Sequence, residues 1–188
     1  MKKYLFTVFA VLIVIAVYPV EMQKIQLTEI GVELKIPESW SILEADSGYV
    51  QLTSGDENAT HHIAKYNIEN EKEDNDLSIL DDEKKDEYLE SAKNLIEGNS
   101  PEYYFDYEEC SYKSINDEMY LHIVCSAEID EACINNENYK DFPESFYNEI
   151  YIWIENNCLY EFYNESTFNI SSTDRDILKS IAVSIKPE

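Results

Sequence analysis

Residues 30–36 alternate between apolar and polar side chains, so Val32, Leu34 and Ile36 fall on one side of an extended chain. A period of two over this length predicts a β-strand with one buried face. Pro37 has no backbone N–H to donate to a neighbouring strand, so we predict that the strand ends there.

Eight further segments carry the patterning of β-strands. In the most apolar of them, Ile150, Ile152 and Ile154 alternate with Tyr151 and Trp153, so both faces of the strand are apolar. A sheet with two apolar faces needs a cover on each. The eight predicted strands are 40–43, 49–53, 61–68, 103–114, 119–129, 148–155, 158–164 and 181–185.

Two segments show helical patterning instead. Residues 80–97 place their apolar side chains on one helical face, with Gly98 as the expected C-cap and Pro101 preventing continuation. A short second helix is predicted over 173–180, because Thr173 opens a capping-box pattern. The apolar face of the first helix comprises Tyr88, Leu89, Ala92, Leu95 and Ile96.

These elements predict an α+β fold. We expect an antiparallel sheet of about six to nine strands covered by helices as an α/β/α sandwich, preceded by an N-terminal apolar helix. No internal repeat or linker divides the chain after the leader. Residues 1–21 are predicted to be a signal peptide or an N-terminal membrane anchor, and residues 22–188 a single domain.

The leader is uncharged from residue 4 to residue 20 and follows Lys2 and Lys3. Its 17 residues lie at the border between a signal-peptide core and a spanning helix. Both alternatives place the body outside the cytoplasm, either secreted or periplasmic or anchored to the membrane by residues 4–20 alone.

The charge balance of the chain limits the classes of partner that the protein can bind. The chain has 14 Lys+Arg against 39 Asp+Glu, a formal net charge of −25. Such a body repels phosphate, so nucleic-acid binding is excluded. The excess acid is interpreted as a solubility feature, with a surface for cations or a basic partner as the alternative.

The chain has four cysteines, and their spacings contain no CxxC pair and no zinc-ribbon pattern. An even number in an exported protein predicts disulfides, for which three connectivities are possible. If residues 116–119 form the loop of a hairpin, Cys110 faces Cys125 across the strands, which leaves Cys133 and Cys158 for a second bridge. We therefore hypothesise two bridges.

No catalytic, cofactor-binding or metal-binding residue is assigned. The motifs GxSxG, GxGxxG, HExxH and the P-loop are absent. Adjacent His61 and His62 should point to opposite faces of a strand, and they and His122 are interpreted as ordinary strand histidines.

Within the acidic segment 69–82, residues 74–78, DNDLS, begin like a calcium loop. Ile79 stands where an EF-hand requires glycine and Lys85 where it requires glutamate, so an EF-hand is excluded. A looser, weak calcium site within 69–82 is kept as an alternative.

The order of these elements resembles the PsbP-like fold, which is named for a photosystem II extrinsic protein and shared by many bacterial secreted proteins. The resemblance covers residues 25–186 and rests on the motifs at 32–40, VELKIPESW, and 177–181, ILKSI. It implies an α/β/α sandwich and no shared catalytic residues. Trp40 in the first motif is interpreted as a core or edge anchor, not as a residue that stacks on a ligand.

Three hypotheses for function follow. The first is an exported, non-enzymatic cell-envelope domain that binds a protein or a surface component. The second is an acidic surface protein that binds divalent cations, and the third is a small extracytoplasmic hydrolase, which would need a pocket with convergent polar groups.

Overall fold

The computed structural model describes residues 20–68, 76–134 and 137–187. The leader up to residue 19 and the acidic stretch 69–75 lie outside these ranges, so the predicted N-terminal helix and most of the calcium alternative do too. No helix among the described residues is long and apolar enough to cross a membrane.

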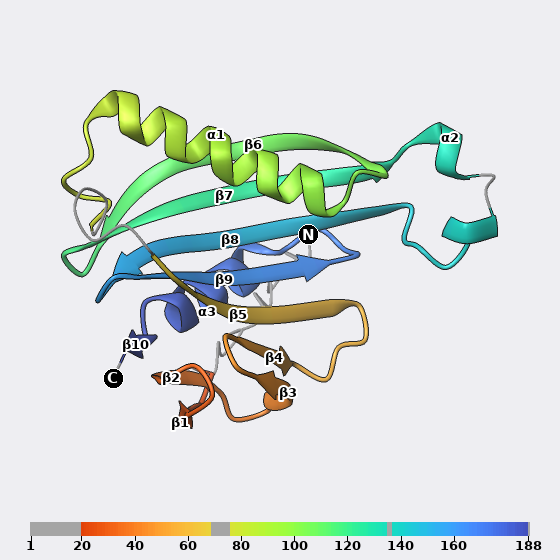
Figure 1. Cartoon of the computed structure of the whole chain (residues 1–188). Helices are drawn as coiled ribbons and strands as arrows, with labels where there is room; N and C mark the ends of the chain where they lie inside the picture. The colour runs from red at the N-terminus through yellow and green to blue at the C-terminus, as the bar shows by residue number, and fades with distance from the viewer. Residues whose placement is uncertain (1–19, 69–75, 135–136, 188) are drawn as a thin grey trace, which may run out of the picture.

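Seven strands form the main antiparallel sheet, in the order β3-β4-β5-β9-β8-β7-β6 (Figure 1). This confirms the predicted α+β class with a large antiparallel sheet. The strands are β3 (Ser41–Asp46), β4 (Tyr49–Thr53), β5 (Ala59–Asn67), β6 (Tyr103–Ile115), β7 (Glu118–Ile129), β8 (Ser145–Glu155) and β9 (Cys158–Ser166).

Helix α1 (Asp82–Asn99) lies across one face of this sheet (Figure 1). Its predicted apolar side packs, except for the 56% exposed Leu95, against a buried cluster from β7 and β8. The predicted C-cap at Gly98 is wrong, because the helix continues through Asn99 and Ser100 is the cap. The strand residues of the cluster are Leu121, Ile123, Cys125, Ile150, Ile152 and Ile154.

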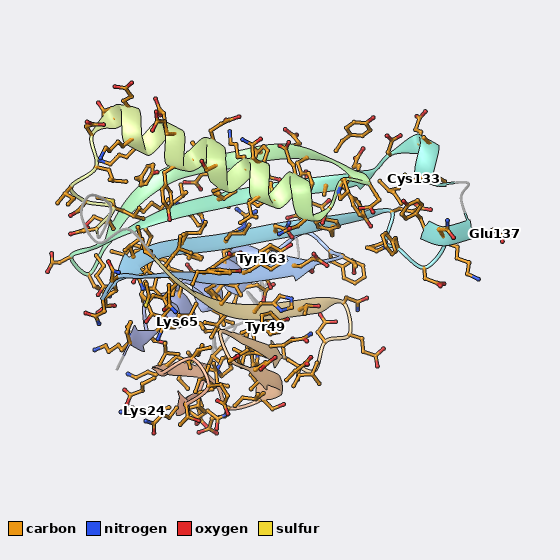
Figure 2. All side chains as sticks on the ribbon, in the orientation of Figure 1. Lys24, Tyr49, Lys65, Cys133, Glu137 and Tyr163 are labelled. Carbon is orange, nitrogen blue, oxygen red and sulfur yellow. The ribbon has the colours of Figure 1, made fainter. Side chains whose placement is uncertain are left out.

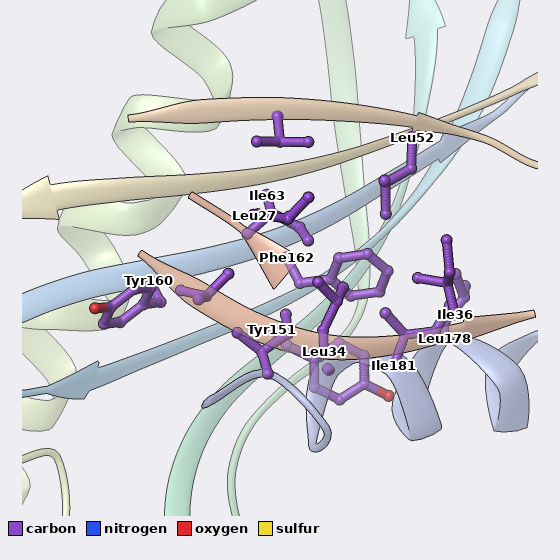
Figure 3. Close-up of a cluster of buried hydrophobic side chains, with 14 of the residues drawn as sticks. Leu27, Leu34, Ile36, Leu52, Ile63, Tyr151, Tyr160, Phe162, Leu178 and Ile181 are labelled. Atoms are coloured by element: carbon purple, nitrogen blue, oxygen red, sulfur yellow. The ribbon is translucent and has the colours of Figure 1, made fainter. Parts of the chain in front are cut away.

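The opposite face is covered by helix α3 (Ser172–Ala182) and by a second, three-stranded sheet of order β1-β2-β10. Its strands are β1 (Met22–Leu27), β2 (Val32–Pro37) and β10 (Lys186–Pro187). Leu34 and Ile36 of β2 meet Phe162 of β9 and Leu178 of α3 in the larger core cluster (Figure 3). Trp40 packs at the margin of this cluster, as the anchor interpretation expected.

The expected α/β/α sandwich therefore needs correction, since one outer layer combines a helix with a small sheet. Strand β1 was not predicted, because Leu27 is its only buried residue. It pairs antiparallel with the whole of β2.

The C-terminal prediction also differs from the structure. The predicted strand 181–185 is mostly the end of α3 and the turn after it. Leu178, Ile181 and Ile185 are all buried, and their spacing of three and four residues is helical. The N-cap lies two residues earlier than predicted: it is Ser171, whose side chain accepts a hydrogen bond from the backbone N–H of Asp174.

Two tight turns set the register of the large hairpins. Asn116-Asp117 joins β6 to β7 and Asn156-Asn157 joins β8 to β9, all with positive φ. Two-residue turns of this kind match the twist of the strands that they join. The hairpin around Asn156-Asn157 was predicted, whereas the β6–β7 loop is shorter than the predicted 116–119.

Candidate functional site

A hollow lies beside α1, on the face of the sheet that this helix covers only in part. The cluster under α1 draws mainly on β6, β7 and β8, so the side chains of β5 and β9 on this face are less covered. Two cavities of about 240 and 280 Å³ lie there between the helix and the sheet. Both are lined by Tyr66, Ala92, Leu95, Ile152 and Glu161, so they form one depression, which we call the α1 groove.

The walls of the α1 groove are largely apolar. Phe105 and Ile150 line its deeper part, while Leu95 and Tyr66 are 56% and 50% exposed at its rim. Apolar side chains with half of their surface in water can be buried by a bound partner. The groove can therefore take an apolar side chain of another molecule.

Tyrosine hydroxyls give the same groove a polar lining. The Tyr49 hydroxyl is hydrogen-bonded to Nδ1 of His62, and the His62 ring lies 5.7 Å from that of Tyr163. Figure 2 shows Tyr49 and Tyr163 on neighbouring parts of the sheet. Burial lowers the pKa of His62, which makes it a neutral group in the groove.

Glu161 is the one acidic residue that lines the α1 groove, and no Lys or Arg of the described chain lines it. Burial raises the pKa of its carboxyl group, because removal from water disfavours the charged form. A basic group entering the groove would stabilise the charged form of this carboxyl group. The groove is thus electrostatically suited to a cation.

Asn148 forms part of the floor. It is 1% exposed, and neither polar atom of its side chain has a hydrogen-bond partner among the described residues. Its register partner is Cys125, and a thiol is only a weak hydrogen-bonding group. A buried amide without partners costs stability, so this position favours a ligand that can bond to it.

On the other face of the sheet, His122 and Glu149 form a buried polar network that lines none of the cavities described here. His122 Nε2 lies 3.0 Å from Glu149 Oε1, which also accepts the Tyr151 hydroxyl at 2.8 Å. Arg175 of α3 lies 3.8 Å from the second carboxylate oxygen. This network joins α3 to the sheet and is structural.

The structure does not show the two hypothesised bridges, and the predicted register, with Cys110 directly opposite Cys125, is wrong. A bulge at Glu108 and the short turn place Cys110 opposite Ile123, and Cys125 opposite Tyr107. Cys133 lies in α2 (Glu131–Ile134), next to the short helix η1 (Glu137–Tyr139), at one end of the sheet (Figure 2). Cys158 starts β9 at the opposite end, about 35 Å away along the 11 residues of β8. All four cysteines are free.

The three histidines lie in strands, as predicted. His61 and His62 point to opposite faces, since His61 stacks on Trp40 while His62 lies in the α1 groove. In the described part of the chain, no three His, Cys, Asp or Glu side chains are arranged to hold a metal ion. Residues 76–82, the described part of the predicted calcium segment, therefore form no metal-binding cluster with other described residues.

The sequence interpretation missed the groove residues Asn148 and Glu161. Both are polar residues in strands whose neighbours on the same face are apolar or aromatic. That interruption was a usable signal, although the groove itself depends on where α1 lies.

Comparison with known proteins shows the fold. No protein-family model and no curated protein matches the chain. The solution structure of cyanobacterial PsbP from Synechocystis sp. PCC 6803 superposes with a TM-score of 0.60 at 11% identity, covering 92% of this chain and 96% of that one. The Saccharomyces cerevisiae Ran-binding protein Mog1p gives a TM-score of 0.59 at 4% identity, covering 89% and 96%.

These two structures confirm the predicted resemblance: the chain has the PsbP-like fold, to which Mog1p also belongs. At such low sequence identity the similarity shows the fold, and it does not assign a function to any residue of this chain.

Proposed function

We propose that this protein is an exported, non-enzymatic module of the cell envelope that binds a protein segment in the α1 groove. One observation carries the proposal: a groove with apolar walls contains a single partly buried carboxylate and no Lys or Arg from the described chain. Such a site matches an apolar side chain next to a lysine or arginine.

The apolar part supplies affinity. Burying one large side chain against Leu95 and Ile152 contributes about 1.5–3 kcal/mol. Tyr66 and Tyr163 add aromatic surface with hydroxyls that can bond to a partner's backbone.

The acidic part supplies orientation and partner choice. A cation beside Glu161 would offset the burial that raises the pKa of this carboxyl group. The net charge of −25 would also speed the approach of a basic partner and repel acidic ones.

Binding is favoured over hydrolysis by the hydrogen bonds in the groove. A hydrolase needs a nucleophile bonded to its base. Nδ1 of His62 is instead bonded to the phenol of Tyr49, whose pKa is raised by burial and by Glu44. The fold neighbour Mog1p is by its name a Ran-binding protein, which also supports a binding role.

Export is proposed from the leader, Lys2-Lys3 followed by the uncharged residues 4–20. A phosphatase reporter that is active only outside the cytoplasm, fused after Glu188, should be active. Activity of a cytoplasmic reporter at the same place would contradict export. Fractionation with and without high salt or detergent would then separate an anchored form from a secreted form.

The groove is tested by panning a random peptide library against the purified protein. We expect selected peptides to carry a large apolar residue within a few positions of Lys or Arg. Glu161→Gln, which keeps the size of the side chain, should remove the preference for the basic residue and keep that for the apolar one. Glu90→Gln, on the exposed side of α1, is the matched control. Selection of the same peptides by a Leu95→Asp variant would contradict the proposed site.

A further inference from the structure

A second cavity lies on the opposite face of the sheet from the α1 groove. It has a volume of about 210 Å³ and is bounded by the β4–β5 loop, the end of β9 and the first turns of α3. We call it the α3 cavity. The residues that matter for its chemistry are Trp40, Asp56, His61, Asn164, Phe168 and Asp174.

His61 is the unusual residue of the α3 cavity. It is 3% exposed, and neither ring nitrogen has a hydrogen-bond partner among the described residues. Trp40 stacks on it with ring centroids 3.9 Å apart. Asn164 lies beside it without meeting hydrogen-bond geometry and is itself 3% exposed. Burial lowers the pKa of His61 to about 4, so the ring is neutral and keeps one nitrogen as an acceptor.

The charge of the α3 cavity has one sign. Asp56 and Asp174 line it, and no Lys or Arg of the described chain does. Asp56 Oδ1 accepts two bonds from Asn58, and Asp174 Oδ2 bonds to the Ser171 hydroxyl. The other oxygen of each carboxylate is left for a ligand as far as the described residues are concerned.

Two aromatic rings complete the cavity. Trp40 forms part of its wall, and Phe168 lies at its rim with 63% of its surface exposed. Aromatic faces attract cations through their quadrupole, and carboxylates and neutral imidazole accept hydrogen bonds from the N–H groups of such cations.

We propose that the α3 cavity binds an organic cation with N–H donors, an ammonium or guanidinium group on a short aliphatic chain. The aliphatic part lies against Trp40 and Phe168, which gives Trp40 a ligand contact that the sequence interpretation did not assign to it. The charged end is directed toward Asp56 and Asp174. His61 and Asn164 accept or complete the remaining hydrogen bonds. The site is separate from the α1 groove, so either proposal can fail without the other.

The test uses n-butylammonium and n-butylguanidinium as probes on the full chain. The readouts are the NMR signals of the Trp40 indole N–H and the His61 ring. We expect both cations to shift these signals in a saturable way at millimolar concentration, whereas butyrate of the same chain length should not. Replacing both carboxylates, Asp56→Asn with Asp174→Asn, should weaken binding about tenfold, because each charge contributes modestly at an exposed position.

Asp46→Asn is the matched control, since Asp46 is exposed at the far end of the β3–β4 hairpin and lines no part of the cavity. It should change the affinity less than about twofold. If the double variant disturbs the N-terminus of α3, Asp56→Asn alone replaces it in the binding test, because Asp56 lies in a loop. Absence of a saturable shift with either cation, or equal shifts with butyrate, would overturn the proposal. Tighter binding of Zn²⁺ with the same shifts would overturn it in favour of a metal site.

Discussion

His122 and Glu149 lie side by side on β7 and β8, with Nε2 of the imidazole 3.0 Å from Oε1 of the carboxylate and both side chains almost fully buried. Lys113 Nζ lies 2.9 Å from the other ring nitrogen, Nδ1. A lysine ammonium only donates, so Nδ1 accepts and Nε2–H donates to Glu149. The pair fixes one tautomer of His122 inside the sheet.

We expect Glu149→Ala to lower the free energy of unfolding by about 2–6 kcal/mol, because it leaves two buried donors, the Nε2–H of His122 and the Tyr151 hydroxyl, without their acceptor, at about 1–3 kcal/mol each. Denaturant titration measures this. Glu90→Ala, at an exposed position on α1, should change stability by less than about 0.5 kcal/mol. Equal effects of the two variants would show that the network is not structural.

The burial of His61 should make stability depend on pH. Its folded pKa is about 4 against an ordinary value of 6.5. Below pH 6.5 His61 binds a proton in the unfolded chain, whereas in the folded chain it binds one only near pH 4. The free energy of unfolding therefore falls by up to about 3 kcal/mol as the pH is lowered across this window. Above pH 6.5 the group contributes no slope.

His61→Gln isolates this effect, since glutamine does not titrate. The difference in unfolding free energy between the two proteins should shift in favour of the variant as the pH falls through the window. Burial raises the pKa of Glu161 and Glu165, which acts in the opposite direction but equally in both proteins. Parallel pH curves would refute a buried neutral His61.

Two glycines should respond in opposite ways to alanine. Gly98 lies inside α1, and an added Cβ would meet open space. Gly98→Ala should therefore stabilise by about 0.5–1 kcal/mol. Gly48 has φ +94 and an added Cβ would lie 3.3 Å from the Lys65 carbonyl oxygen, so Gly48→Ala should destabilise. Destabilisation by Gly98→Ala would restore the C-cap that the sequence predicted.

The cysteines should all be recovered as thiols. Peptide mapping without reduction should give no peptide joining Cys133 to Cys158, because they lie at opposite ends of the sheet. Cys125 should react last with an alkylating reagent, since it is 1% exposed and burial raises its pKa to about 12. A Cys110–Cys125 linkage would mean that the register of β6 and β7 differs from the one described.

The sequence predicted most where one pattern had one meaning. Ile150 and Tyr151 alternate in a strand buried on both faces, and they do belong to the two core clusters. The spacing of Ile181 and Ile185 is compatible with a strand and with a helix. In the structure both belong to the same core cluster as Leu34 and Phe162, and they lie at the end of α3 and just after the turn that follows it.

Register and site were less predictable. One extra residue, Glu108, bulges from β6 and moves the residues before it by one position relative to β7. The α1 groove exists because the helix lies over one half of a face, which no periodicity specifies. In the sequence, the signal for the groove is the presence of the polar residues Asn148 and Glu161 in otherwise apolar strands.

The most direct test of the α1 groove is photo-crosslinking in the cell that produces the protein. A photoreactive phenylalanine analogue replaces Leu95 or Tyr66 at the rim, or Leu43 on the edge strand β3. Leu43 is 62% exposed and lines neither cavity of the groove. We expect one and the same partner protein at Leu95 and Tyr66, none at Leu43, and loss of the crosslink when Glu161→Arg is added. Equal crosslinking at Leu43, or a crosslink that survives Glu161→Arg, would contradict the groove as the binding site.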